Sequence, residues 1–114
     1  MGETGIRLDL TGQTAIVTGA SSGIGAGIAR LFGRAGANVV INYRSSEDGA
    51  RETLRAIEEA GGTGRIVQAD VSQEGDVKRL FEEACDAFGT VHVLIANAGL
   101  QRDAPAHEMS LADW

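Results

Sequence analysis

Four short apolar runs alternate with longer amphipathic segments along this chain. The runs, each bounded by glycine or polar residues, are residues 14–18, 38–42, 65–69 and 91–96. Within them apolar residues follow one another directly, as in Val39-Val40-Ile41, instead of alternating with polar ones. Strands of a parallel sheet have this pattern when both faces of the sheet are covered, because neither face meets water. The runs therefore predict four parallel strands.

The segments between the runs carry apolar residues at helical spacing, which predicts three helices. Their apolar stripes are Ile24, Ile28, Leu31 and Phe32; Ala50, Leu54 and Ile57; and Val77, Leu80, Phe81, Ala84 and Phe88. Gly36, Gly61 and Gly89 are placed to end the three helices. Strands that alternate with crossover helices predict an α/β fold.

Two of these helices are preceded by start signals. Ser45 and Asp48 have the spacing of a capping box for the second helix, and Ser72 is placed to be the N-cap of the third. We expect both serines to bind N–H groups of the first helical turn.

Composition and charge narrow the class of partner. The 114 residues are 43% hydrophobic but only 4% aromatic, so we expect one domain with an aliphatic core. Sixteen acidic against ten basic residues give a net charge of -6. This charge argues against nucleic acid or an anionic membrane as the main partner, so any bound phosphate must be held by local groups.

Cysteine and histidine residues give no indication of a disulfide or a metal site. Cys85 is the only Cys; it borders the apolar face of the third helix, and we expect it to be buried as a small hydrophobe. His92 and His107 have no acid or nucleophile paired with them in the sequence, and we expect both on the surface. The chain shows no signal segment and no apolar run that could span a bilayer. We therefore expect a reducing, cytoplasmic location and no membrane insertion.

The segment most informative about function lies where the first strand turns into the first helix. It reads Thr18-Gly19-Ala20-Ser21-Ser22-Gly23-Ile24-Gly25. Glycines let the backbone come close to a phosphate, and the unpaired N–H groups and positive dipole end of a helix start hold its charge. A net acidic protein can bind an anion in this way. The alternative is that these glycines only shape a tight turn.

Three motifs in register resemble those of the short-chain dehydrogenase/reductase family. They are the Thr-Gly-x-x-x-Gly-x-Gly spacing of the turn, Asp70-Val71 after the third run and Asn97-Ala98-Gly99 after the fourth. The resemblance covers residues 8–114 and corresponds to about the first half of a family member. It implies the first half of a Rossmann-type doubly wound parallel sheet, with residues 1–114 as one NAD(P)-binding domain. The chain departs from the family at Ala96, where an Asn that helps to tie the central strands together is usual.

The resemblance implies coenzyme-binding roles for the three motifs and for the end of the second strand. The residues are Gly19, Ser21, Ser22, Gly23, Ile24, Gly25, Arg44, Ser45, Asp70, Val71, Asn97, Ala98 and Gly99. Asp70 is expected to contact the adenine. Ser21 and Ser22 either donate to the coenzyme or stabilise the turn through its own backbone. Ile24 could line the nicotinamide side of the pocket, although its helical spacing favours packing in the core.

The end of the second strand, Asn42-Tyr43-Arg44-Ser45, bears on the choice of coenzyme. In dinucleotide-binding folds an acidic residue here binds the ribose 2′-OH of NAD, whereas a basic residue accommodates the 2′-phosphate of NADP. No carboxylate stands at this point, and the guanidinium of Arg44 suits a phosphate. We expect NADP as the coenzyme, with NAD still open as a second one. The alternative is that Arg44 is only a solvated charge at the end of a strand.

The catalytic residues that the resemblance implies are absent from this chain. Tyr43 and Lys78 are its only Tyr and Lys. They cannot form the Tyr-x-x-x-Lys pair, which in family members acts together with a Ser on the reacting carbonyl. Ser110 and Asp113 have the spacing of a helix start, yet the chain ends at Trp114. We therefore expect a coenzyme-binding fragment of a longer protein, inactive by itself.

The resemblance also implies a reaction class. Family members are NAD(P)-dependent oxidoreductases, and we expect the full-length protein to act on an alcohol or sugar hydroxyl or the matching ketone, and to form a homo-oligomer. Segments 42–45, 97–100 and 107–110 look like those of glucose 1-dehydrogenases, with 3-oxoacyl carrier-protein reductases next. Two other hypotheses stay open: a stand-alone dinucleotide-binding or sensing module without catalysis, and a remnant that binds no ligand.

Overall fold

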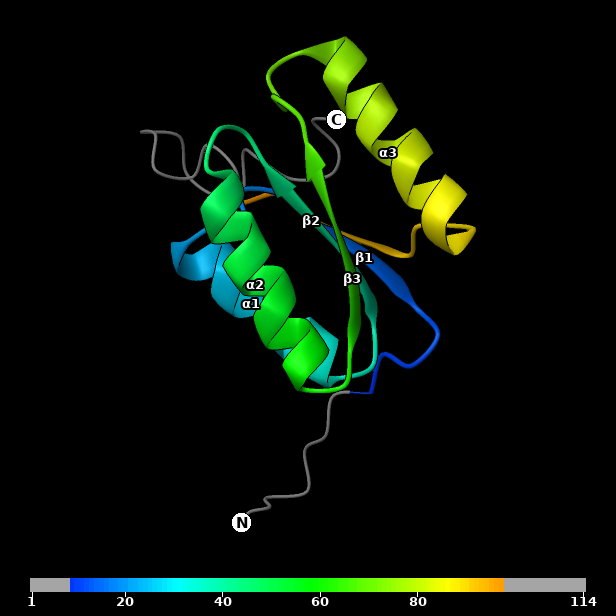
Figure 1. The fold of residues 1–114 in the computed structure, drawn as a ribbon. Coiled ribbons are helices and arrows are strands. Elements are labelled where there is room, and N and C mark those ends of the chain that lie inside the picture. The colour runs from blue at the N-terminus through cyan, green and yellow to red at the C-terminus, as the bar shows by residue number, and fades with distance from the viewer. Residues whose placement is uncertain (1–8, 98–114) are drawn as a thin grey trace.

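Strands and helices alternate along residues 9–97, the part of the chain that the computed structural model describes (Figure 1). In chain order they are β1 (Thr14–Val17), α1 (Gly23–Arg34), β2 (Asn38–Tyr43), α2 (Glu47–Glu59), β3 (Thr63–Gln68), α3 (Glu74–Phe88) and β4 (Val93–Ile95). The expected alternation is confirmed. β3 starts earlier than its apolar run because Thr63 and Gly64 also pair with β2, and β4 is shorter than the run 91–96.

All strand pairs are parallel, in the order β3-β2-β1-β4. In central β1, Ile16 is in register with Val40 of β2 and with Leu94 of β4. The chain builds outward from β1 through β2 to β3, and then returns to place β4 on the other side of β1. This reversal creates a switch point between β1 and β4. Ligands of open parallel sheets bind outside the carboxyl ends of the strands at such a point.

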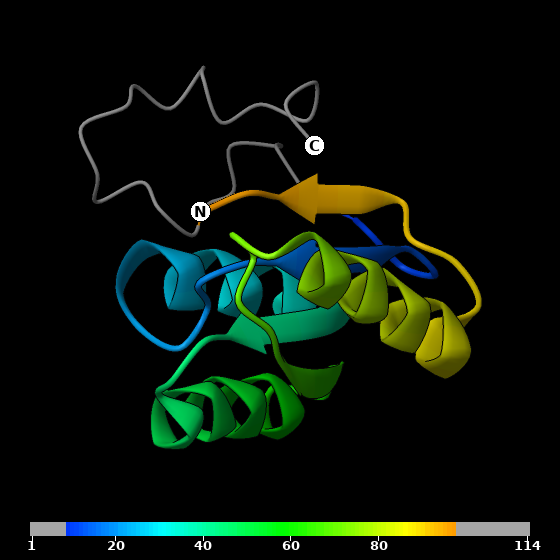
Figure 2. The ribbon, with the colours of Figure 1, turned by 90° about the horizontal axis from the view of Figure 1, so that it is seen from above.

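Helices cover both faces of the sheet, as the unbroken apolar runs predict. Figure 2 shows α1 and α2 on one side and α3 on the other. Val17, Val39 and Ile41 belong to the core under α1 and α2, whereas Ile16 and Val40 belong to the core under α3. Neighbouring strand residues therefore serve opposite faces, and none of these five is exposed to water. No helix within residues 9–97 is long and apolar enough to cross a membrane.

α1 is closest to its neighbours through small residues, while Ile28 and Phe32 of its apolar stripe are half-buried against the same core. Its buried residues are Gly25, Ala26, Ala29 and Gly33. Small side chains bring the helix close to its neighbours: a Cβ added at Gly33 would lie 2.8 Å from Ile57 of α2. Ile24, in contrast, is 73% exposed. The expectation that Ile24 packs in the core is wrong, because the first turn of α1 lies beyond the carboxyl end of β1.

The start of α2 differs from the expected capping box. The helix begins at Glu47 after Ser46 as N-cap, and no side chain makes a cap hydrogen bond there. Glu47 instead forms an ion pair with Arg51 one turn later. The capping box of Ser45 and Asp48 is therefore wrong. The expected helix ends are confirmed: α1, α2 and α3 stop at Arg34, Glu59 and Phe88, just before Gly36, Gly61 and Gly89.

α3 also starts and packs differently from what its sequence predicts. Its N-cap is Gln73, without a side-chain cap bond. Ser72 is therefore not the cap, and its hydroxyl donates to the Asp70 carboxylate at 2.6 Å. Cys85 is exposed, so its expected burial is wrong as well. It follows buried Ala84 directly, and one helical residue rotates a side chain by about 100°, off the packed face.

Candidate functional site

The residues expected to bind a coenzyme gather at the carboxyl edge of the sheet, because every strand of a parallel sheet ends there. The turn 18–22 joins β1 to α1, Arg44 and Ser45 follow β2, and Asp70 and Val71 follow β3. Asn97 follows β4 beside the switch point. Ala98 and Gly99 lie outside the described residues. Arg44 and Ser45 are exposed, whereas half-buried Val71 packs against the core under α3.

The first half of the glycine-rich turn is fastened to three neighbouring elements. The Gly19 N–H donates to Asn42 Oδ1 at 3.2 Å, and the Ala20 N–H donates to the Asn42 carbonyl at 2.8 Å. The Thr53 hydroxyl of α2 donates to the Ala20 carbonyl at 2.9 Å, and Asn97 Nδ2 donates to the Gly19 carbonyl at 3.1 Å. The amides of Gly19 and Ala20 are therefore engaged inside the protein. The amides that follow, at the start of α1, are the ones left available to a ligand.

The start of α1 presents backbone N–H groups that no side chain takes up. Within residues 9–97, Ser22 at the N-cap makes no side-chain cap bond. The first turn of α1 contains no acidic residue, whereas α2 and α3 begin with two acidic residues each. The first hydrogen bond of α1 runs from the Ala26 N–H to the Ser22 carbonyl. The three preceding N–H groups have no acceptor within the helix; they belong to Gly23, Ile24 and Gly25. A diphosphate group fits this arrangement of donors and positive dipole.

Two serines and two glycines shape the turn around these amides. Ser21 is half-buried and Ser22 is exposed, and among the described residues neither hydroxyl has a hydrogen-bond partner. Gly19 has a φ of 63°, which residues with a side chain rarely adopt. A Cβ at Gly25 would collide with the Gly19 carbonyl oxygen and lie 2.6 Å from Asn97 Nδ2. The close approach of α1 to the turn therefore requires glycine.

Thr18 and Asn97 join the two strands at the switch point. The Thr18 hydroxyl donates to the Ile95 carbonyl at 3.2 Å and accepts the Asn97 N–H at 2.8 Å. Together with the bond from Asn97 Nδ2 to Gly19, these contacts tie the ends of β1 and β4 to the glycine-rich turn. The central strands are thus linked at this edge although Ala96 replaces the Asn that is usual in the family.

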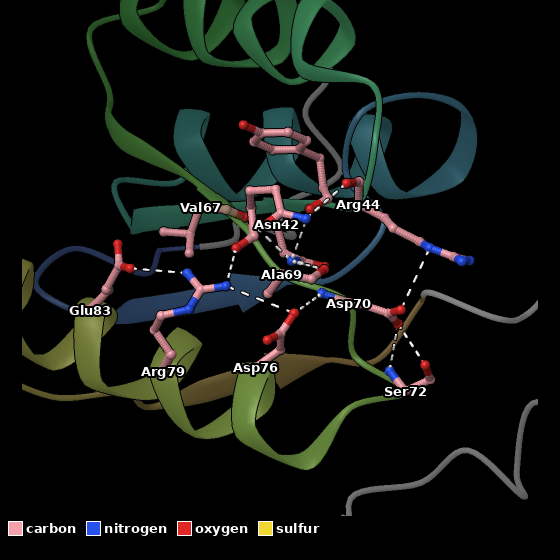
Figure 3. A network of polar contacts seen from close by, with 11 residues as sticks. Asn42, Arg44, Val67, Ala69, Asp70, Ser72, Asp76, Arg79 and Glu83 are labelled. Atoms are coloured by element: carbon pink, nitrogen blue, oxygen red, sulfur yellow. Dashed lines mark hydrogen bonds and ion pairs between the residues drawn. The ribbon is translucent and has the colours of Figure 1, made fainter.

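The other end of the site contains an acid and a base that the structure brings together. Arg44 Nε lies 3.7 Å from Asp70 Oδ2, and the Arg44 side chain is 78% exposed (Figure 3). Asp70 Oδ1 accepts the Ser72 hydroxyl and the Ser72 N–H, at 2.6 and 3.0 Å. The two Ser72 hydrogen bonds and the Arg44 charge lower the pKa of Asp70 below its ordinary value. Asp70 is therefore a carboxylate at neutral pH, available to accept hydrogen bonds.

A polar network on α3 holds the backbone at Asp70. Asp76 Oδ2 accepts the Asp70 N–H at 2.8 Å. Arg79 lies 3.8 Å from Asp76 and 3.2 Å from Glu83, and it donates to the Gln68 carbonyl at 2.7 Å (Figure 3). The end of β3 is thereby fastened to the first turns of α3. The position of Asp70 depends on these contacts as well as on the sheet.

Sequence reasoning missed the two buried polar residues that support the turn. Asn42 is 2% exposed and Thr53 is not exposed at all. A signal was present for each: Asn42 directly follows the apolar run Val39-Val40-Ile41, and Thr53 lies next to Leu54 on a helix with a narrow apolar stripe. Polar residues at such positions need hydrogen-bond partners when they are buried.

The remaining polar candidates lie away from this edge. His92 is exposed, as expected, and its Nδ1 accepts the Thr14 N–H at 3.0 Å, at the amino end of β1. His107 lies outside the described residues. Among residues 9–97, no three His, Cys, Asp or Glu side chains are grouped so that they could hold a metal ion.

Known proteins resemble the chain over nearly its whole length. The family model described as short chain dehydrogenase matches residues 13–114. The "3beta-hydroxysteroid dehydrogenase 1" of Eggerthella lenta is 53% identical over 106 residues, which are 93% of this chain and 41% of that protein. The "Glucose 1-dehydrogenase 2" of Bacillus subtilis is 50% identical over 107 residues, which are 93% of this chain and 42% of that protein.

Solved structures with the same fold also include a dehydrogenase. The crystal structure of a hydroxysteroid dehydrogenase from Escherichia coli superposes with a TM-score of 0.77 at 34% identity, over 89% of this chain and 43% of that one. The chain thus spans about two fifths of the length of the relatives it matches. The family match agrees with the parallel half-sheet and with the glycine-rich start of α1. The chain belongs to the short-chain dehydrogenase family.

Proposed function

We propose that this chain is the coenzyme-binding half of an NAD(P)-dependent oxidoreductase that acts on an alcohol or sugar hydroxyl or the matching ketone. The observation that carries the proposal is the uncapped, acid-free start of α1 beside the switch point. The family match supports it, as do the names of two relatives, which describe dehydrogenases of a hydroxysteroid and of glucose.

Groups at the carboxyl edge of the sheet are assigned to different parts of the coenzyme. The amides of Gly23, Ile24 and Gly25 bind the diphosphate, and the hydroxyls of Ser21 and Ser22 donate to it. Exposed Ile24 covers the nicotinamide side of the pocket. Asn97, Ala98 and Gly99 are also proposed to bind the coenzyme. When bound, the coenzyme supplies or accepts the hydride. The protein residues that move the proton are proposed to lie outside these 114 residues, which contain no Tyr-x-x-x-Lys pair.

The adenosine part of the coenzyme is assigned to the ends of β2 and β3. The Asp70 carboxylate accepts a hydrogen bond from the adenine, beside Val71 and Ser45. Arg44 has most of its side chain in solvent and pairs with Asp70 at the edge of this region. Its guanidinium can therefore turn toward a 2′-phosphate at little cost, since exposed ion pairs contribute about 0–1 kcal/mol.

A turnover assay on the full-length protein tests the reaction class. With NADP or NAD and a panel of secondary alcohols, hydroxysteroids and sugars, we expect reduced coenzyme to form with at least one substrate, and the 114-residue chain alone to be inactive. Full-length protein that binds a coenzyme and oxidises or reduces nothing in the panel would instead support a stand-alone binding or sensing module. Protein that binds neither coenzyme would reject both functions.

The Arg44→Ala variant tests the choice of coenzyme. Loss of a charge-assisted bond to the 2′-phosphate is expected to raise the Kd of NADP(H) by about tenfold, or about 1.4 kcal/mol, while the Kd of NAD(H) changes by less than about twofold. Arg34→Ala is the matched control, because Arg34 is also exposed but lies in the last turn of α1, at the opposite edge of the sheet. Equal losses for both coenzymes, or no loss, would reject the role of Arg44.

A further inference from the structure

Asn42 is a fully engaged polar side chain in the apolar interior of the sheet. It is 2% exposed, at the carboxyl end of β2. Its Oδ1 accepts the Gly19 N–H at 3.2 Å, and its Nδ2 donates to the carbonyls of Val67 and Ala69 at 3.3 and 3.2 Å. Figure 3 shows the Asn42 amide between the end of β2 and the end of β3. One side chain therefore joins the glycine-rich turn, β2 and β3.

The turn depends on this side chain because the strand ladder ends before it. The register of β1 and β2 ends at Val17 and Ile41. Beyond that pair β1 turns away, and the Gly19 N–H finds its acceptor in the Asn42 side chain, while the next amide, of Ala20, bonds the Asn42 carbonyl. One residue thus holds two successive amides, that of Gly19 with its side chain and that of Ala20 with its backbone carbonyl.

The end of β3 has backbone bonds that do not involve the Asn42 side chain. The Ala69 N–H donates to the Tyr43 carbonyl at 2.9 Å, and the Asp70 N–H is held by Asp76. These bonds remain when the Asn42 side chain is changed. The Gly19 N–H has no second acceptor among the described residues. Removing the amide of Asn42 should therefore leave the Gly19 N–H without an acceptor and release the first amide of the turn.

We propose that Asn42 is a positioning residue for the diphosphate: by holding the Gly19 N–H it sets the path of the turn, and so directs the amides at the start of α1. It acts through Gly19 and touches no coenzyme atom. The inference rests on the proposed function. It gives Asn42 a role different from that of Arg44, which is exposed and is assigned to the 2′-phosphate alone. Loss of Asn42 should therefore weaken NAD(H) and NADP(H) alike.

The test replaces Asn42 by leucine in the full-length protein, because leucine keeps the volume and removes both hydrogen-bonding atoms. We expect the Kd of ADP-ribose, measured by calorimetry, to rise about tenfold or more. The Kd values of NAD(H) and NADP(H) should rise by the same factor, and kcat at saturating coenzyme should stay within about twofold of wild type. The control is Ile57→Val, a change in the fully buried core at the far end of α2, which lowers stability without touching the turn.

The outcomes separate a positioning role from general damage. If Asn42→Leu does not fold, Asn42→Ala replaces it, since the smaller side chain admits a water molecule, and the same pattern is expected with smaller factors. An unchanged Kd of ADP-ribose in a folded variant overturns the inference, as does a loss of kcat at unchanged Kd or an equal loss of affinity in Ile57→Val. If wild-type full-length protein binds no dinucleotide, the proposed function itself fails, and this inference with it.

Discussion

Replacing Gly25 by alanine is expected to weaken the binding of NADP(H) to the full-length protein by about a hundredfold. The added Cβ would collide with the carbonyl oxygen of Gly19 and lie 2.6 Å from Asn97 Nδ2. A backbone carbonyl cannot swing aside like a long side chain, so α1 and the turn must move apart. A displacement of about 1 Å in groups that position a ligand can cost about a hundredfold.

Gly27→Ala is the matched control for this variant. Gly27 lies two residues further along the same helix, and a Cβ there would meet nothing within 4 Å. Alanine favours a helix interior over glycine by about 1 kcal/mol, so this variant should be slightly more stable and bind the coenzyme as wild type does. Calorimetric Kd values and melting temperatures of both variants check the pair. Wild-type affinity in Gly25→Ala would show that the close contact between α1 and the turn is not needed.

The largest loss of stability is expected from Leu80→Ala. Leu80 has no exposed surface, and it belongs to the core between α3 and the sheet with Ile16, Val40 and Val67. α3 is the only helix among the described residues on this face, so truncating Leu80 leaves a cavity in the core that holds α3 to the sheet. We expect the free energy of unfolding to fall by about 2–5 kcal/mol.

Urea unfolding of the full-length protein measures this loss. The matched control is Leu31→Ala, the same truncation on α1 at a side chain that is 44% exposed, for which we expect a loss below about 1 kcal/mol. Similar losses at the two positions would contradict the assigned core. Because Leu80 lies away from the turn, the folded Leu80→Ala variant should keep its affinity for coenzyme.

Most of the fold could be predicted because the apolar pattern is a direct consequence of a sheet buried on both faces. Val39-Val40-Ile41 has no polar interruption because Val39 and Ile41 serve one core and Val40 the other. The ends of the helices followed from glycines for a similarly local reason. The glycine-rich turn and Asp70 were expected to follow the first and third strands, and in the parallel sheet these positions share one edge.

The wrong predictions share a physical cause: helical spacing gives the direction of a side chain but not what lies opposite it. Ile24 points along the stripe of α1, yet it extends past the edge of the sheet and is exposed. Ser72 was expected to be a cap, but α3 begins one residue later with Gln73 as N-cap, and the Ser72 hydroxyl donates to the Asp70 carboxylate. Cys85 neighbours the packed face of α3 without lying on it.

The supports of the site could not be predicted because they are long-range contacts. Asn42 and the Gly19 N–H that it holds are 23 residues apart, and Thr53 is 33 residues from the Ala20 carbonyl to which it donates. The hydrogen bond between Asn97 and Gly19 joins residues that are 78 positions apart in the sequence. Such pairs follow from the order of the strands, and no local sequence pattern predicts them. The motifs placed the glycine-rich turn, and the structure adds the side chains that hold it in place.

We expect the free amides at the start of α1 to hold a diphosphate, and an NMR titration tests this most directly. Nitrogen-15-labelled full-length protein is titrated with ADP-ribose while the backbone amide signals are followed. We predict large, saturating shifts for Gly23, Ile24 and Gly25, and small ones for Glu47 and Glu74, which begin α2 and α3. Unmoved signals at residues 23–25 at saturating ligand would contradict the account.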